Sequence, residues 1–377
     1  MAKYKLDELC EFITDGTHQT PEYCDDGVIF LSSKDVTERK INWDDVRYIP
    51  DELHEKLYKR LSPRKNDILL AKNGTTGVAA IVDRDEIFDV YVSLAVLRPL
   101  ETIYPKYLLY AINSPVAKRQ FNAGLKGIGV PNLHLGVIRE TIVNVAQWDE
   151  QKKVCEILDR VANLIEKRKT ELDMLDNLIK ARFVELFGMP VSNTKGWSTE
   201  SMEDVAPIVN YKGEFHEEVW LLNLDMVEAQ TGRIIDYLIV TEDEVGNSTC
   251  TFDTSNVLYS KLRPYLNKVV IPNRCGYATS ELVPLQPVNT KINREYLAFM
   301  LRNDEFVNMI NEKVAGAKMP RVSMNDFRKF DVPVPPIELQ NQFADFVHQV
   351  DKSKVAVQKA LDETQMLFDS LMQKYFV

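Results

Sequence analysis

The feature that most constrains this sequence is an internal repeat. Sliding the 377-residue chain against itself by 189 positions aligns residues 127–187 with residues 316–376 without a gap. Gln151 then falls on Gln340, and the register is kept mainly through apolar type, which is the property that packing requires. Upstream the similarity continues more loosely, for example between the stretches DILLAK and NVLYSK. The chain is therefore predicted to contain two copies of one module, and its length also favours two domains.

Each copy begins with a module that mixes strands and helices. Short apolar runs such as VIFLSS, DILLAK and YVSLAVL lie between Gly, Pro and Asp residues, which is typical of strands separated by turns. The stretch PKYLLYAINSPVAKRQF and its counterpart NREYLAFMLRNDEFVNMI interrupt these runs and are predicted to be helical. The predicted fold class is α+β, with two α/β modules.

Each module is followed by a long helix. Residues 152–187 contain neither Pro nor Gly, and apolar side chains recur every seven residues, as in a coiled coil. A helix of about 36 residues is roughly 54 Å long, and its single apolar stripe requires a partner. Because the first helix leads into the second module and the second helix follows it, we expect an antiparallel two-helix coiled coil with an approximate two-fold axis. The predicted seam contains Leu158, Ile165, Leu172, Ile179, Val350, Val357, Leu361 and Phe368.

Composition favours a cytosolic protein. The sequence lacks a run of about eighteen apolar residues, the length that a membrane span would need. The N-terminal MAKYKLDELCEF lacks the apolar core of a signal peptide. The five cysteines are odd in number and scattered, so they are expected to be reduced thiols. A formal net charge of −10 argues mildly against nucleic acid as a partner. Residues 113–139 and 254–280, however, contain no acidic residue and could present basic surfaces.

The motifs of common catalytic sites are missing. The sequence contains no phosphate-binding loop, dinucleotide or adenosyl-cofactor fingerprint, aminomethyltransferase motif, nucleophile elbow or zinc-protease motif. The five histidines are isolated, and none has the spacing of a metal ligand. Asp25, Glu38 and Lys40 loosely resemble the carboxylate–lysine set of a nuclease, although a solvated hairpin turn is the better interpretation. We therefore expect no catalytic residue and no metal site.

Three loops carry side chains that suit DNA. The loops TDGTHQTP and AKNGTTG, and SKLRPYLNK as the counterpart of the second, combine Lys or Arg with hydroxyl, amide and aromatic groups. Such mixtures fit contacts to phosphates and to base edges. A turn capped by Asp15 and ordinary exposed hairpins are the alternatives. The candidate DNA-contacting residues are Thr17, His18, Gln19, Lys72, Asn73, Thr75, Lys126, Asn132, Tyr211, Lys212, Lys261, Arg263, Tyr265, Lys268, Lys318 and Arg321.

The whole chain resembles the specificity (S, HsdS) subunit of type I restriction–modification enzymes. The likeness rests on VNVAQWDEQKKVCEILDRVA and its partner VPVPPIELQNQFADFVHQVD, and on TDGTHQTP, DILLAKNGTTG, NVLYSKLRPYLNK and GYATSELVPLQP. The family's Pro-Pro–Glu-Gln signature is split between the copies. The first copy keeps Glu150-Gln151 without the prolines, and the second keeps Pro335-Pro336 but has Leu339 before Gln340. The order of residues and the helix repeat survive in both copies.

The resemblance implies a non-catalytic subunit that reads DNA. Its parts would be target-recognition domains at 1–148 and 188–337, and spacer helices at 149–187 and 338–377. The implied partners are double-stranded DNA, two methyltransferase (M) subunits and, through the complex, translocase–nuclease (R) subunits. The complex would act as an adenine-N6 DNA methyltransferase and ATP-dependent endonuclease. S-adenosylmethionine, ATP and Mg would then bind to the partner subunits and not to this chain.

Physical reasoning supplies further expectations. Half-sites on one face of the duplex lie about 34–36 Å apart, which a rigid helix pair could span. Because the two modules differ in sequence, the target should be bipartite and non-palindromic. The acidic net charge predicts weak DNA binding by the chain alone, with partners supplying much of the phosphate contact. The main alternative is an interaction adaptor, with two protein-binding heads on a coiled coil and no DNA binding.

Overall fold

The computed structural model describes residues 1–37, 40–125, 131–215, 218–314 and 319–377. These residues form two compact units. Unit 1 comprises Met1–Lys169 and Lys359–Val377, and unit 2 comprises Thr170–Gln358. Each long helix therefore contributes one part to each unit. Within the described residues, no helix is long and apolar enough to cross a membrane.

Unit 1 contains two main sheets. The first has the strand order β2–β10–β7–β8 and is antiparallel throughout. The second has the order β6–β3–β9, in which β3 and β9 are parallel. The strands are β1 (Ala2–Lys5), β2 (Cys10–Asp15), β3 (Val28–Leu31), β4 (Val36–Thr37), β5 (Lys40–Ile41), β6 (Arg47–Ile49), β7 (Ile68–Ala71), β8 (Ala79–Ile81), β9 (Phe88–Val90), β10 (Leu94–Pro99) and β11 (Ile142–Val145).

The helices of unit 1 pack mainly against the first sheet, except for the first α-helix, which contacts β9 of the second sheet. They are η1 (Leu6–Leu9), α1 (Asp51–Tyr58), α2 (Pro105–Ile112), α3 (Pro115–Ala123), α4 (Leu135–Glu140) and α5 (Trp148–Phe187). Helices α2 and α3 both start with proline, whose missing N–H group is tolerated in the first turn. The Ser114 hydroxyl caps α3 by accepting a hydrogen bond from the Ala117 amide at 3.3 Å. Tyr107, Leu108 and Ile112 of α2 are fully buried in the core.

Unit 2 also contains two main sheets, and its second sheet differs from the second sheet of unit 1. The three-stranded sheet β17–β16–β19 corresponds to β8–β7–β10, and the four-stranded sheet β14–β13–β18–β15 contains a parallel pair, β13–β18. The strands are β12 (Thr199–Ser201), β13 (Glu218–Leu222), β14 (Leu238–Thr241), β15 (Thr249–Phe252), β16 (Val257–Ser260), β17 (Val269–Val270), β18 (Gly276–Thr279), β19 (Leu282–Leu285) and β20 (Asp331–Pro333). The helices are α6 (Met202–Val205), η2 (Leu224–Met226), η3 (Glu242–Glu244), η4 (Pro264–Leu266), α7 (Arg294–Arg302), α8 (Asp304–Glu312), α9 (Met324–Arg328) and α10 (Ile337–Phe376).

The repeat of the sequence is a repeat of the structure. Helices α5 and α10 have the same length, and their first and last residues are 189 positions apart. Strands β7 and β16, and helices α3 and α8, are displaced by the same 189 residues. The predicted α+β fold with an internal repeat is therefore confirmed.

A buried glutamine joins each module to its long helix. Gln151 is 2% exposed; its Oε1 accepts from the Tyr104 amide at 2.8 Å, and its Nε2 donates to the Ala146 carbonyl at 2.9 Å. Gln340 is fully buried and makes the equivalent bonds to Asn293 at 2.9 Å and Pro335 at 2.8 Å. The glutamine is thus the part of the split Pro-Pro–Glu-Gln signature that makes equivalent contacts in both copies.

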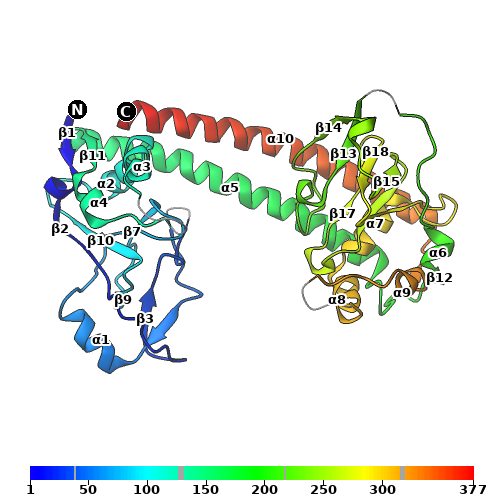
Figure 1. The fold of residues 1–377 in the computed structure, drawn as a ribbon, viewed down its shortest axis with the longest axis horizontal. Helices are drawn as coiled ribbons and strands as arrows, with labels where there is room; N and C mark the ends of the chain where they lie inside the picture. Colours follow the sequence, from blue (N-terminus) through cyan, green and yellow to red (C-terminus); the bar gives the residue numbers. More distant parts are fainter. Residues whose placement is uncertain (38–39, 126–130, 216–217, 315–318) are drawn as a thin grey trace. The chain divides into compact units, whose positions relative to one another are not determined.

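In each unit the two long helices run side by side in opposite directions (Figure 1). In unit 2, Lys354 Nζ lies 2.6 Å from Asp176 Oδ1, whereas Phe343, earlier in α10, packs against Phe187, later in α5, with ring centroids 5.5 Å apart. In unit 1, the Arg168 guanidinium donates to the Ala360 carbonyl. This bond explains how an arginine is accommodated at the seam, because the guanidinium reaches a backbone acceptor beside the apolar row.

Most of the predicted seam is shielded from solvent. Leu158, Ile165, Ile179, Val350 and Phe368 are buried, whereas Leu172, Val357 and Leu361 are half-buried. The heptad pattern did not predict the aromatic ends of the helices. Phe187 at the end of α5 packs against Tyr296, and Phe376 at the end of α10 packs against Tyr107, with ring centroids 4.7 and 5.1 Å apart. These rings belong at once to the helix pair and to the module cores.

Candidate nucleic-acid interface

The hairpins that follow β7 and β16 are each held by the same two backbone contacts, and we call this arrangement the loop frame. In unit 1, the Leu133 amide donates to the Lys72 carbonyl at 2.9 Å, and in unit 2 the Val322 amide donates to the Lys261 carbonyl at the same distance. Isolated β-bridges then join Asn73 to Asn132 and Leu262 to Arg321. Each hairpin that follows β7 or β16 is therefore fastened to the segment that precedes α4 or α9. The frame is shared, but the side chains at equivalent positions differ.

In unit 1, a buried ion pair connects two of the predicted loops. Lys72 is 6% exposed, and its Nζ lies 2.5 Å from Oδ2 of Asp15, which is 8% exposed. Asp15 ends β2, just before the TDGTHQTP loop turns, and its other oxygen lies 3.5 Å from Nε2 of His18. Lys72 is therefore not available at the surface, because its ammonium group is used to hold the two loops together.

Other candidates in the first loop face solvent. His18 and Gln19 are exposed, and Thr17 is half-buried, with its amide donating to the Val90 carbonyl at 3.0 Å. Gly16 precedes them, and a Cβ there would clash with the Val90 carbonyl. The glycine thus lets the loop pass close to the end of β9 and directs the following side chains outward.

Two asparagines face each other across the unit 1 bridge. Asn73 and Asn132 are half-buried, and in the described structure the Oδ1 atom of each is shielded from solvent without a hydrogen-bond partner. Thr75, in the same hairpin, is exposed. Because these oxygens are acceptors shielded from solvent, a base edge could reach them only if the side chains rotate outward.

In unit 2, the corresponding hairpin carries cations and an aromatic ring. Arg263 is exposed, Tyr265 is 47% exposed, and Lys261 is half-buried. Arg321 comes to this hairpin through the bridge, and its guanidinium binds Glu281 at 2.9 Å. The hydrogen bond and the charge of Glu281 raise the pKa of Arg321. The structure therefore brings four of the predicted unit 2 residues together.

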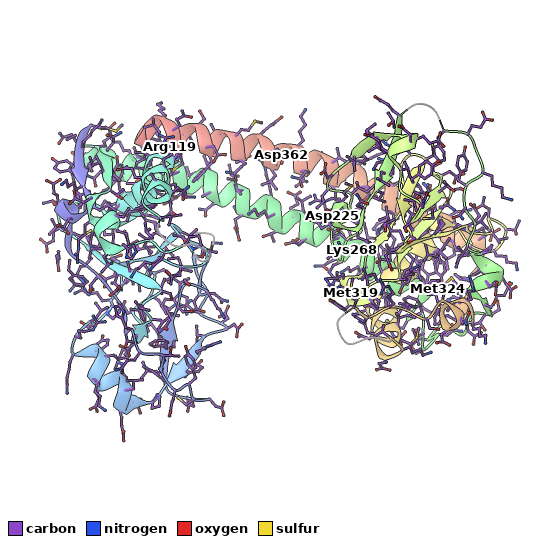
Figure 2. All side chains as sticks on the ribbon, in the orientation of Figure 1. Arg119, Asp225, Lys268, Met319, Met324 and Asp362 are labelled. Atoms are coloured by element: carbon purple, nitrogen blue, oxygen red, sulfur yellow. The ribbon has the colours of Figure 1, made fainter. Side chains whose placement is uncertain are left out.

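Lys268 points to a different neighbour. Its Nζ donates to the Leu224 carbonyl at 2.6 Å, and Asp225 lies beside it (Figure 2). Burial lowers the pKa of Lys268, and the negative charge of Asp225 opposes that shift. Lys268 therefore holds the η2 segment against the hairpin.

The remaining candidates are dispersed. Tyr211 is half-buried and packs on Phe215, and its carbonyl accepts a hydrogen bond from the Thr251 hydroxyl at 2.7 Å; the neighbouring Lys212 is exposed. Tyr211 thus contacts strand β15 without belonging to a strand itself. Lys126 and Lys318 lie outside the described residues.

The nuclease-like set is not assembled in the part of the chain that the structure describes. Lys40 Nζ lies 3.0 Å from Oε1 of Glu166 on α5, and Glu38 lies outside the described residues. Among the described residues, no group of three or more His, Cys, Asp or Glu side chains could hold a metal ion.

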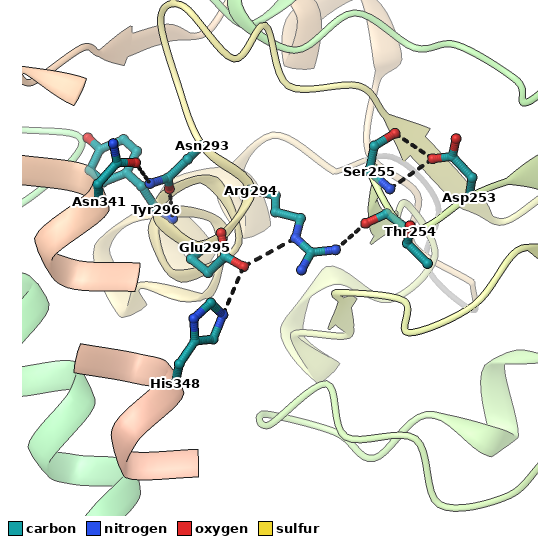
Figure 3. Close-up of polar contacts among 9 residues, drawn as sticks. All are labelled: Asp253, Thr254, Ser255, Asn293, Arg294, Glu295, Tyr296, Asn341 and His348. Carbon is teal, nitrogen blue, oxygen red and sulfur yellow. Dashed lines mark hydrogen bonds and ion pairs between the residues drawn. The ribbon is translucent and has the colours of Figure 1, made fainter. Parts of the chain in front are cut away.

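Each module also contacts its long helix through a polar pair in which the acidic and the basic residue change places between the copies. In unit 1, Lys106 of α2 lies 2.8 Å from Asp159 of α5. The residues 189 positions later are Glu295 of α7 and His348 of α10, whose Oε1 and Nε2 atoms are 3.4 Å apart. Figure 3 shows Glu295 between His348 and Arg294, which also binds the Thr254 carbonyl.

Sequence reasoning missed the acids that organise the candidate loops. The sequence suggests a turn cap at Asp15, whereas in the structure Asp15 pairs with Lys72, and no sequence pattern indicates Glu281 as the partner of Arg321. The reversal at Lys106 and Asp159 is visible in the sequence. At the offset of 189, these residues align with Glu295 and His348, so an acidic and a basic residue exchange places.

The chain contains two α+β modules with the same loop frame but different loop side chains, and each unit includes a part of both long helices. This architecture is that of a protein with two recognition modules. A family model agrees with this class. The model for the type I restriction modification DNA specificity domain matches residues 1–174 and 195–364. The chain therefore belongs to the family of type I restriction–modification specificity subunits and is the DNA-recognition subunit of such a system. Enzymatic activity in these systems resides in the partner subunits.

Individual relatives cover most of the chain. The specificity subunit of the EcoDI type I restriction enzyme of Escherichia coli is 24% identical over 355 residues, which are 82% of this chain and 77% of the relative. The MjaIX specificity subunit of Methanocaldococcus jannaschii is 19% identical over 351 residues, 85% of this chain and 79% of the relative.

Solved structures share the fold. The S subunit of a type I restriction–modification system from M. genitalium superposes with a TM-score of 0.56 at 15% identity, covering 100% of this chain and 96% of the other. A chain from a study of complex assembly and conformational transition of the type I R-M system gives a TM-score of 0.57 at 16% identity, with 99% and 97% coverage.

Proposed function

We propose that each module reads one half of a bipartite, non-palindromic DNA sequence. The observation that carries this proposal is the shared loop frame with unlike side chains. Asn73 and Asn132 occupy the bridge in unit 1, where unit 2 has Leu262 and Arg321. Amide groups and a guanidinium group favour different base edges, so the two modules would select different half-sites.

The candidate residues divide by accessibility into two proposed roles. His18, Gln19, Thr75, Arg263 and Tyr265 are exposed and would contact DNA directly. Lys72 and Lys268 are engaged within the protein and would position their loops. Thr17, Asn73, Asn132 and Lys261 are half-buried, and Arg321 is exposed but paired with Glu281; these residues would complete the two surfaces. Lys126, Tyr211, Lys212 and Lys318 stay proposed contacts on the basis of their chemistry alone.

The long helices have a second proposed role as a spacer and docking surface. We divide the chain into recognition domains at 1–148 and 188–337 and spacer helices at 149–187 and 338–377. Apolar side chains with 38–71% exposure occur on the outer faces of both helices, where they would bind two M subunits. These are Ile157, Leu164, Met174, Leu178, Val184, Val355, Met366 and Leu367. R subunits would join through the complex.

Cofactors would belong to the partners. S-adenosylmethionine, ATP and Mg would bind to the M and R subunits, which carry the chemistry of methylation and cleavage. The complex would act in the cytoplasm, where it meets the DNA that it modifies. The family match favours this function over the alternative of an interaction adaptor without DNA binding.

Methylation profiling tests the proposal. The chain is produced together with its M subunit in a host that lacks other adenine methyltransferases, and methylated adenines are mapped across the genome. We expect one motif made of two unlike half-sites separated by a fixed number of unspecified bases. A palindromic motif, or no methylation in cells that contain the assembled complex, would contradict the proposal. The M subunit without this chain is the control.

A further inference from the structure

Arg263 has a backbone conformation that L side chains rarely adopt. Its φ is 50° and its ψ is 62°, which places it in the left-handed region. The residue 189 positions earlier is Gly74, which has a φ of 73° and adopts this conformation without a steric penalty. The hairpin therefore requires a left-handed residue at this corner, and unit 2 has an arginine where glycine would be less strained. Strain of this kind is characteristic of functional sites.

The corner is held rigidly on both sides. The Arg263 amide donates to the Pro320 carbonyl at 2.8 Å, and its own carbonyl accepts from the Leu266 amide at 2.9 Å. Pro264 is buried, and the Asn267 side chain, also buried, donates to the Arg302 carbonyl at 2.9 Å. These bonds hold the Arg263 backbone in one position without a ligand. A side chain on such a fixed backbone can meet a ligand in a defined geometry.

The guanidinium of Arg263 is left for a ligand. The residue is exposed, and within the described parts of the chain its side chain has no hydrogen-bond or ion-pair partner. Its neighbour across the bridge, Arg321, is held by Glu281 instead. The exposed ring of Tyr265 lies two residues further along the same hairpin. A guanidinium without a protein partner, on a backbone held in place on both sides, is suited to bidentate recognition.

We propose that Arg263 is a specificity-determining residue that reads a guanine in the half-site bound by unit 2. The arginine fork matches the O6 and N7 acceptors of guanine in the major groove. A phosphate contact would not require a strained residue at a fixed corner, because any flexible cation on the loop would serve. Unit 1 has Gly74 at this position and therefore lacks the contact. This inference rests on the function proposed above.

The test compares three variants of the full chain in complex with its M subunits. Arg263→Gly removes the fork and the strain together, so its Tm should equal or exceed that of the wild type. Arg263→Lys keeps the charge but loses the fork. Arg119→Ala is the matched control, because Arg119 is an exposed cation on α3 of unit 1. Methylation motifs and affinities for duplexes with single base changes are measured for each.

We expect Arg263→Gly and Arg263→Lys to make one fixed G·C pair of a single half-site degenerate while every other position is unchanged. Affinity for the cognate duplex should fall roughly 5- to 150-fold, and discrimination at that pair should disappear. Arg119→Ala should leave the motif intact. An unchanged motif, a loss of affinity equal for all sequences, or a lower Tm for Arg263→Gly would overturn the assignment. Absence of a motif with the wild-type chain would instead overturn the function on which it rests.

Discussion

Single buried polar side chains hold each recognition module on its helix. Gln340 bonds three backbone groups on two segments: it accepts from the Asn293 amide and donates to the carbonyls of Lys291 and Pro335. Because it is fully buried, none of these groups could turn to water if the side chain were removed. The stability of this junction therefore depends on one residue.

Gln340→Met should lower the free energy of unfolding by about 2–4 kcal/mol, because it leaves a buried amide and two carbonyls without partners while nearly preserving volume. Urea denaturation of the full chain measures the change. Gln349→Met is the control, since Gln349 is exposed on the same helix and should change stability by about 0.5 kcal/mol or less. Equal effects of the two substitutions would contradict the role of Gln340.

The Asp15–Lys72 pair gives a second prediction at this scale. Lys72→Met should destabilise unit 1 by about 3–5 kcal/mol, because it leaves the Asp15 carboxylate buried and unpaired. The double variant Lys72→Met with Asp15→Leu should recover much of this loss, since an apolar pair needs no compensating charge. Thermal and urea unfolding provide the readout. If the double variant is less stable than Lys72→Met alone, the pair is not the cause.

At the scale of elements, the contact between a module and its helix is specific to each copy. Helix α2 presents a cation to α5 through Lys106, whereas α7 presents a carboxylate to α10 through Glu295. Exchanging these elements would place the Glu295 carboxylate opposite that of Asp159, and would leave Lys106 opposite the His348 imidazole without an acid. The reversed polarity thus disfavours pairing of a module with the wrong helix.

A double-mutant cycle tests this element-level pairing. Glu295→Lys should destabilise unit 2 by about 1–3 kcal/mol, because a cation replaces a carboxylate that binds Arg294 and lies beside His348. Adding His348→Asp recreates the pair of unit 1 and should restore about 0.5–1 kcal/mol, a modest gain because His348 is 55% exposed. Additive effects in urea unfolding would show that the two residues do not interact.

At the scale of the whole molecule, charge determines how DNA binding depends on partners. The chain has a net charge of −10, and we therefore expect other subunits to supply much of the phosphate contact. Under the proposed function, the exposed apolar residues on α5 and α10 would form the surface to which those subunits bind.

We expect the chain alone to bind cognate duplex weakly and with a shallow salt dependence, and the complex with M subunits to bind tightly with a steeper one. A salt titration of binding by fluorescence anisotropy, with and without the M subunit, measures both slopes. Noncognate duplex of equal length controls for nonspecific attraction. Equal affinities with and without the M subunit would refute the expectation.

The sequence alone determined the two-copy architecture, the fold class, the two long helices and the register between the copies. Periodic apolar positions and the spacing of the repeat are properties of the chain itself, and packing must follow them wherever they occur. The seam residues Leu158 and Ile165 could be named from the heptad for this reason, whereas Phe187 and Phe376 needed the module cores to explain them.

Only the tertiary structure decided which loop residues meet and which remain free. The sequence predicts Lys72 as a surface cation, but in the structure Lys72 is buried and pairs with Asp15, 57 residues earlier. Arg263 and Arg321 look alike in the sequence, yet Glu281 pairs with Arg321 and not with Arg263. Such pairings depend on contacts between distant segments, which no local pattern records, and they set which charges are available to a ligand.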